Sequence, residues 1–155
     1  MIKFKKILKT ILFWLVSFTW GLPLTLIGTF GALYMLITGH KAYRYGYFIY
    51  FVTNTHGCAF EGGPFFFVSG DCRFNEQIKA HEVGHGSIQN WVFGPLTVFV
   101  CTIPGVVRFW YRKYLKRFKG KKESDLPPYE SIWFEKTATK WGLKFVDIMK
   151  KSEVL

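Results

Sequence analysis

The longest pattern in the chain is an uncharged stretch, residues 10–40, which follows a lysine-rich start. Its apolar part, Ile11 to Thr38, would extend about 42 Å as a helix at about 1.5 Å per residue, more than the ~30 Å hydrocarbon core of a bilayer. Gly21-Leu22-Pro23 interrupts it, and proline disfavours a continuous helix. A cleaved secretory signal is the alternative, but its apolar region spans only about 7–15 residues. The pattern predicts a membrane anchor over residues 1–40, as a kinked helix or a helical hairpin.

Aromatic and β-branched side chains dominate the next part of the chain, residues 43–69. Residues 47–52 and 64–68 have the composition of strands, and Gly62-Gly63 has that of a two-residue turn. The pattern predicts a hairpin of about residues 57–69, and with it a small antiparallel sheet or hairpin.

Two helices are predicted in the second half of the chain. Asn75 has the residue type of an N-cap, for a helix that begins at Glu76 and continues through two histidines. A last helix is predicted over about residues 129–149, from the spacing of its apolar side chains. Strands followed by helices in one chain of 155 residues, the size of a single domain, predict an α+β fold.

A second apolar run, residues 91–107, lies between these helices and is broken by Gly94-Pro95 and Pro104-Gly105. It is shorter than the ~20 residues of a transmembrane helix, and it is predicted not to span. In residues 108–122, basic side chains alternate with aromatic ones. That pattern suits a helix at a lipid headgroup surface, or an ordinary solvated basic face.

The formal net charge is +11, and thirteen of the 21 Lys and Arg residues lie from Arg108 onward. A basic excess fits either nucleic acid or an anionic membrane surface. The aromatic, uncharged segments beside it favour the lipid bilayer as a partner, so no nucleic-acid partner is expected. The expected location is a membrane, the bacterial cytoplasmic membrane, and the side on which the remaining chain lies is left open.

The chemistry resides in the run His81-Glu82-Val83-Gly84-His85. Residues four apart on a helix share one face, so His81 and His85 can present two imidazole nitrogens to one cation. Glu82 lies about 100° round the helix and stays free to act on a water as a general base. Zn²⁺ held by three protein ligands with one open position supports hydrolysis. The alternative is a pair of structural histidines beside a solvated glutamate.

A third ligand is required, and Glu135 is the candidate because it lies within a predicted helix. Positions three, four and seven after it carry Ala138, Thr139 and Gly142, a stripe of small residues that would let this helix approach the zinc helix closely. Glu123 and Asp125 lie among lysines, and Asp147 and Glu153 lie near the lysine-rich chain end. Replacement of Glu130 is expected not to weaken metal binding, and His40 and His56 remain alternatives.

These residues carry a resemblance. The order H-E-x-G-H on one helix, followed about fifty residues later by Glu135 on another, resembles the zincin metallopeptidases whose third ligand is a glutamate, the gluzincins. The chain also resembles a family of small, uncharacterised bacterial membrane proteins, in Gly21-Leu22-Pro23, the histidine motif running on through Ser87, Ile88 and Gln89, Phe93-Gly94-Pro95-Leu96, Ile103-Pro104-Gly105, and Trp133-Phe134-Glu135 with Ala138. The resemblance implies a zincin-like fold and a zinc site of His81, His85 and Glu135 with Glu82 as base.

Two further expectations follow from the resemblance. Gluzincins often carry Asp or Asn four residues after the ligand glutamate, to hold a ligand histidine, and here that position is Thr139, which has no charge. Zinc peptidases also bind extended substrates along a sheet edge, and the candidate edge strand consists of Phe65, Phe66, Phe67 and Val68. A purely structural hairpin is the alternative.

The sequence therefore predicts a membrane anchor over residues 1–40 and a zinc-binding catalytic domain over residues 41–155 that includes the apolar run 91–107. The expected activity is that of a membrane-associated zinc metallopeptidase acting on a peptide or protein substrate. A non-enzymatic membrane interaction protein with a structural or absent metal is the alternative, and zinc-dependent hydrolysis of a non-peptide bond uses the same residues.

Overall fold

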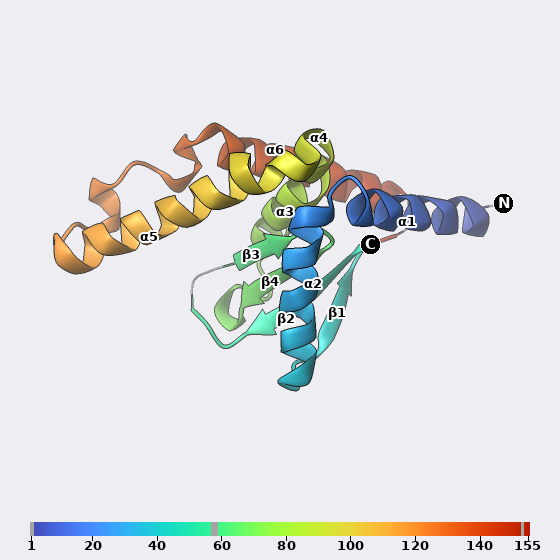
Figure 1. The fold of residues 1–155 in the computed structure, drawn as a ribbon, viewed down its shortest axis with the longest axis horizontal. Coiled ribbons are helices and arrows are strands. Elements are labelled where there is room, and N and C mark those ends of the chain that lie inside the picture. The colour runs from blue at the N-terminus through green and yellow to red at the C-terminus, as the bar shows by residue number, and fades with distance from the viewer. Residues whose placement is uncertain (1, 57–58, 153) are drawn as a thin grey trace.

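The computed structural model describes residues 2–56, 59–152 and 154–155, and it has an α+β fold (Figure 1). A small four-stranded sheet lies at the centre. Helix α2 crosses in front of the sheet in Figure 1, and α1 and α5 extend from the body in opposite directions. The first two residues of the predicted hairpin, 57 and 58, lie outside the described residues.

The N-terminal apolar stretch forms two helices, α1 (Ile2–Phe18) and α2 (Leu22–Ile37), which meet at an angle of 100°. The break lies at the predicted position, because Pro23 is suited to the first turn of a helix and not to its interior. Both helices also contribute to the interior, since Phe13 and Leu24 are fully buried. Helices α1 and α2 thus pack on the same body as the sheet.

Among the described residues, no single helix is both long enough and apolar enough to cross a membrane. Two bent pairs reach the required length and hydropathy only together. One is α1 with α2, and the other joins residues 76–96 to residues 98–118 at an angle of 107°.

The sheet contains β1 (Ala42–Tyr45), β2 (Phe48–Thr53), β3 (Ala59–Gly62) and β4 (Phe65–Ser69), in the order β1-β2-β4-β3. The pairs β1–β2 and β3–β4 are antiparallel, and β3–β4 is the predicted hairpin. Strands β2 and β4 are parallel, so the sheet is mixed and the prediction of a small antiparallel sheet was wrong.

The prediction that residues 65–68 form an edge strand was also wrong. Strand β4, with Phe65, Phe66, Phe67 and Val68, is paired on both sides, and the edges of the sheet are β1 and β3. The physical reason is that β4 carries large apolar side chains on both faces, which favours a central strand covered by helices on both sides.

Two apolar clusters hold the layers together. On one face of the sheet, Phe48 and Phe66 pack with Val83 of α3 (Glu76–Gly84) and Phe145 of α6 (Trp133–Lys151). On the other face, Phe51, Phe65 and Phe67 pack against α2, through Ala32 and Met35. The sheet is therefore the middle layer of three.

Helices α3 and α6 touch through their backbones. A Cβ atom added to Gly84 would lie 1.9 Å from the carbonyl oxygen of Ala138, and one added to Gly142 would lie 1.7 Å from that of Ala80. Only glycine fits at either position. The close approach expected from the small-residue stripe of α6 is present, and it brings the two helices that carry the histidines and Glu135 into contact.

The second apolar run changes direction several times. It contains α4 (Asn90–Phe93), a 3₁₀ turn at Gly94–Leu96 and a π-helical turn at Val98–Thr102, and it leads into α5 (Ile103–Phe118). After α5, the chain runs back beside this helix to a 3₁₀ turn at Tyr129–Ser131, which precedes α6 (Figure 1).

Candidate metal centre

The candidate centre joins the end of α3 to the start of α6. The Asn75 side chain accepts hydrogen bonds from the backbone N–H groups of Gln77 and Ile78, so it caps α3 as predicted. His81 lies in the last turn of α3, and His85 begins a π-helical turn, His85–Gln89. Such single-turn π segments occur frequently at functional sites.

Glycines on both sides of His85 bring other elements close to it. Gly84 contacts α6, and a Cβ atom added to Gly86 would lie 2.1 Å from the carbonyl oxygen of Gly63, in the turn between β3 and β4. Backbone of α6 and of the β3–β4 turn can therefore approach this part of the chain from both sides.

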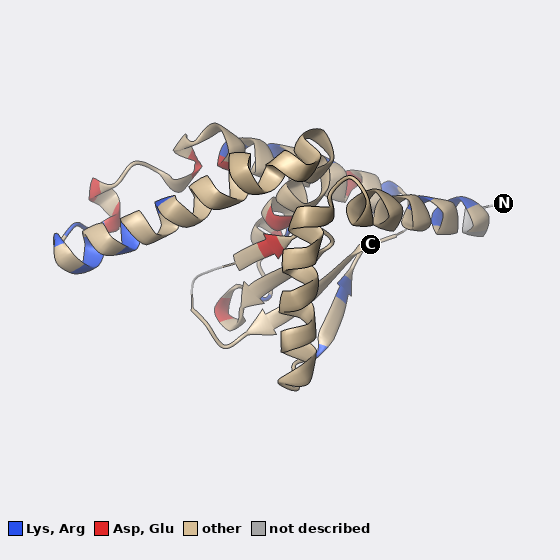
Figure 2. Ribbon diagram, in the orientation of Figure 1, with Lys and Arg blue, Asp and Glu red and all other residues tan. Residues whose placement is uncertain are grey.

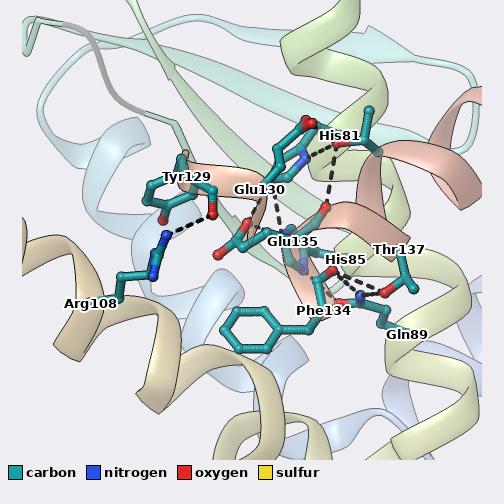
Figure 3. Close-up of polar contacts among 10 residues, drawn as sticks. His81, His85, Gln89, Arg108, Tyr129, Glu130, Phe134, Glu135 and Thr137 are labelled. Atoms are coloured by element: carbon teal, nitrogen blue, oxygen red, sulfur yellow. Dashed lines mark hydrogen bonds and ion pairs between the residues drawn. The ribbon is translucent and has the colours of Figure 1, made fainter. Parts of the chain in front are cut away.

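Three potential ligand atoms converge at this point. The Nε2 atoms of His81 and His85 lie 3.1 and 3.2 Å from Oε2 of Glu135, and 3.2 Å from each other. Figure 3 shows the three side chains pointing toward one another from α3, the π-helical turn and α6. In the part of the chain that the structure describes, this is the group of His, Cys, Asp and Glu side chains able to hold a metal ion.

The triangle fits a zinc ion. Ligand atoms of a tetrahedral zinc site lie about 2.0–2.1 Å from the ion, which places any two of them about 3.3–3.4 Å apart. The three separations of 3.1–3.2 Å fall slightly short of this value. A metal ion would need only a small outward movement of the ligands, and the fourth position of the tetrahedron would stay open.

The hydrogen bonds of the second ring nitrogens prepare both histidines for a metal. Nδ1 of His85 lies 2.6 Å from Oε1 of Gln89, and the Gln89 amide donates to the carbonyl oxygen of Phe134 at 2.5 Å and to Oγ1 of Thr137 at 2.9 Å. Because a carbonyl oxygen only accepts, the Gln89 nitrogen faces Phe134 and its oxygen faces His85. When His85 is neutral, it therefore carries its proton on Nδ1 and directs the Nε2 lone pair to the ligand triangle.

His81 is held by Thr139, the residue at the position where gluzincins often carry Asp or Asn. The distance from Nδ1 of His81 to Oγ1 of Thr139 is 2.8 Å. The Thr139 hydroxyl in turn donates to Oε1 of Glu130 at 2.7 Å. Glu130 thus contacts Thr139 and does not belong to the group of three converging side chains.

Glu135 and His85 each shift the pKa of the other. Burial acts to raise the pKa of Glu135, but hydrogen bonds to His81 and His85 outweigh it and lower this pKa to about 2. Burial acts to lower the pKa of His85, but the hydrogen bond to Glu135 and the charges of nearby glutamates raise it to about 9. Without a metal, the centre therefore holds a proton near neutral pH, and a binding cation must displace it.

Glu82 is buried next to the ligand group. Burial raises the pKa of its carboxyl, His81 and His85 act to lower it, and Glu135 acts to raise it. A carboxyl with a raised pKa beside a metal centre has the properties of a general base.

Two more residues belong to the surroundings of the centre and were missed from the sequence. Glu61 of β3 is only 6% exposed and stands opposite Phe66, so it points to the face of the sheet that α3 covers. Burial raises its pKa to about 7, and His85 and Glu82 are close enough to contribute. Burial, followed by Glu135 and Glu82, raises the pKa of the Tyr129 hydroxyl.

No protein-family model, characterised protein or solved structure matches the chain.

The remaining candidate ligands lie elsewhere. His40 is hydrogen-bonded to Thr38 through Nδ1 at 3.0 Å, and His56 is exposed. Glu123 forms ion pairs with Arg112 and Lys116 of α5. The signal that could have identified Glu61 is a single acidic residue within an aromatic segment of the chain.

Proposed function

We propose that the chain is a membrane-associated zinc metallopeptidase of zincin type, with His81, His85 and Glu135 as zinc ligands and Glu82 as general base. The observation that supports this most is the triangle of Nε2, Nε2 and Oε2 atoms, 3.1–3.2 Å on each side, with both imidazoles oriented by hydrogen bonds at Nδ1.

When bound, zinc supplies a water of lowered pKa and polarises the carbonyl group to be attacked. The chain supplies the rest. Glu82 takes up the proton that leaves the water and passes it to the departing amine, a role for which burial and the raised pKa of its carboxyl prepare it. Glu135, with its lowered pKa, stays ionised throughout.

We propose that the substrate binds along the edge strand β3, and not along β4. It carries Glu61 on the face toward the centre, and its turn to β4 touches the backbone at Gly86. Among the described residues, β4 is the one strand that pairs with β3, and a peptide added to the other edge of β3 would be held by main-chain hydrogen bonds next to the ligand triangle. Peptides are the proposed substrates for this reason.

A lipid bilayer is the proposed surrounding of the helices. Large apolar side chains are exposed along α1, α2 and α5, among them Phe4, Leu12, Phe30, Ile37, Trp110 and Phe118. Lys and Arg gather on α1 and on the outer part of α5, whereas α2 has none (Figure 2). Exposed apolar surface combined with basic groups is typical of helices that lie in an anionic membrane interface.

The decisive test is metal analysis and peptide hydrolysis of the purified chain and its Glu82→Gln variant. We expect about one zinc per chain in both and hydrolysis by the unmodified chain only, measured as new peptide termini in membrane and soluble protein extracts. Glu76→Gln is the matched control, because Glu76 lies on the same helix but pairs with Lys79 outside the centre. A chain without zinc contradicts the proposal, and zinc without new peptide termini favours a structural metal or a non-peptide substrate.

A further inference from the structure

A chain of two hydrogen bonds leads from one of the proposed ligands to an exposed carboxylate. Nδ1 of His81 lies 2.8 Å from Oγ1 of Thr139, and this hydroxyl lies 2.7 Å from Oε1 of Glu130. Figure 3 shows Glu130 beside His81 and Glu135, on the turn that precedes α6.

The direction of each hydrogen bond follows from the groups involved. A carboxylate only accepts, so the Thr139 hydroxyl must donate its proton to Glu130. The lone pairs of the same oxygen are then directed to His81, whose Nδ1 must carry the proton that it shares. When His81 is neutral, its Nε2 is left with a lone pair, as a metal ligand requires.

Thr139 alone would not fix this arrangement. A hydroxyl both donates and accepts, so without Glu130 it could donate to Nδ1 of His81 and leave the proton on Nε2, where it would face the metal position. Thr139 also has a second acceptor within its own helix, the carbonyl oxygen of Glu135 at 3.4 Å. The carboxylate of Glu130 decides between these states.

The turn that carries Glu130 is held from α5. Nη2 of Arg108 donates to the carbonyl oxygens of Pro128 and Tyr129, at 2.7 and 3.3 Å, and to Oγ of Ser131 at 2.9 Å. The guanidinium group of Arg108 also lies over the Tyr129 ring, 5.7 Å from its centroid. Glu130 is exposed, but its backbone is fixed on both sides.

We propose that Thr139 and Glu130 form a positioning pair for His81, in which Glu130 supplies through the threonine hydroxyl the negative charge that gluzincins place directly behind the ligand. The inference rests on the proposed zinc site. It assigns Glu130 a role in metal affinity, although it is separated from the metal position by two side chains.

The test is the zinc affinity of the full-length chain, measured by competition with a chelator at constant pH. We expect Glu130→Gln, which keeps the shape of the side chain, to weaken zinc binding about tenfold, in the range found for outer-shell partners of zinc ligands. Thr139→Val should weaken it at least as much. The double variant should bind as Thr139→Val does, because two residues that act in one chain of hydrogen bonds do not add.

Rescue separates positioning from a merely structural effect. In Glu130→Gln, a second substitution, Thr139→Asp, places a carboxylate directly behind His81, and we expect it to restore zinc affinity to within a few-fold of the unmodified chain. Asp147→Asn is the control, since Asp147 lies on the same helix and pairs with Lys151 on the surface. Circular dichroism of each metal-free variant checks that the fold is retained.

The outcomes distinguish the two proposals. Zinc bound by the unmodified chain with unchanged affinity in Glu130→Gln overturns the positioning pair alone. Multiplied effects in the double variant, or a failed rescue in a folded protein, also overturn it. A chain that binds no zinc overturns both proposals.

Discussion

Replacing Gly142 by alanine should separate the two halves of the metal centre. The added Cβ would lie 1.7 Å from the carbonyl oxygen of Ala80 and 2.9 Å from the backbone nitrogen of Gly84. Ordinary contact requires about 3.4 Å or more, so α6 and α3 must move apart by roughly 1.5 Å. Both obstacles are backbone atoms, and neither can turn aside as a side chain would.

The same movement acts on the ligands. His81 and His85 move with α3 and its continuation, and Glu135 moves with α6. Ligand distances in metal sites hold to within about 0.2 Å, so a shift of this size takes Glu135 out of reach. Zinc affinity should fall by at least the roughly 100-fold upper range of outer-shell substitutions, because a ligand itself is displaced.

The free energy of unfolding should fall as well, but the protein should stay folded. Overpacking of this kind costs about 1–3 kcal/mol, which for a chain of this length lowers the midpoint of thermal unfolding by roughly 2–12 °C. Chelator competition and thermal unfolding of the metal-free protein measure the two effects separately. Gly70→Ala is the matched control, because the nearest atom to its added Cβ would be 3.7 Å away. A folded Gly142→Ala protein with unchanged zinc affinity would refute the reasoning.

Two further predictions concern protons and lipid. The raised pKa of His85, about 9, means that its proton stabilises the metal-free fold fully below its ordinary pKa and that this stability is lost as pH rises through 9. The free energy of unfolding of the metal-free protein, measured with denaturant, should therefore fall between pH 6.5 and 10. The zinc-bound protein should not show this fall. The apparent zinc affinity should rise over the same pH range. Replacement of Lys113, Lys116 and Arg117 by serine should weaken binding to anionic vesicles by roughly fivefold for each charge and leave zinc affinity unchanged. Flotation at low salt measures the vesicle binding. If the unmodified chain binds neutral vesicles as well as anionic ones, the electrostatic part of this reasoning is wrong.

Local signals predicted the helices of the centre well. Asn75 is a residue type that caps helices, and the spacing of four places His81 and His85 on one face whatever the surrounding fold. The small residues after Glu135 indicated a close helix contact, which the backbone approach at Gly84 and Gly142 reproduces. The signals that predicted these features come from residues near one another in sequence.

The order of the strands and the surroundings of the candidate centre depend on distant partners and were not predicted. Phe65 to Val68 looked suited to an edge, but a strand with apolar groups on both faces gains most from burial between two others, and no local pattern gives the order β1-β2-β4-β3. Glu61 and Glu130 were missed for the same reason. One depends on the register of β3 with β4, and the other on where the turn before α6 comes to lie.

The ligand triangle also limits how the chain can meet a bilayer. His85 precedes the second apolar run and Glu135 follows it, yet their ligand atoms lie 3.2 Å apart. The segment 86–134 therefore begins and ends beside the ligand triangle. Arg108 hydrogen-bonds the returning turn, so α5 and that turn stay together as well. If the proposed function and the proposed bilayer contact both hold, lipid that covers the exposed apolar side chains of α5 lies on the same side as the candidate metal centre, and a peptide bound at β3 is cleaved close to the membrane surface.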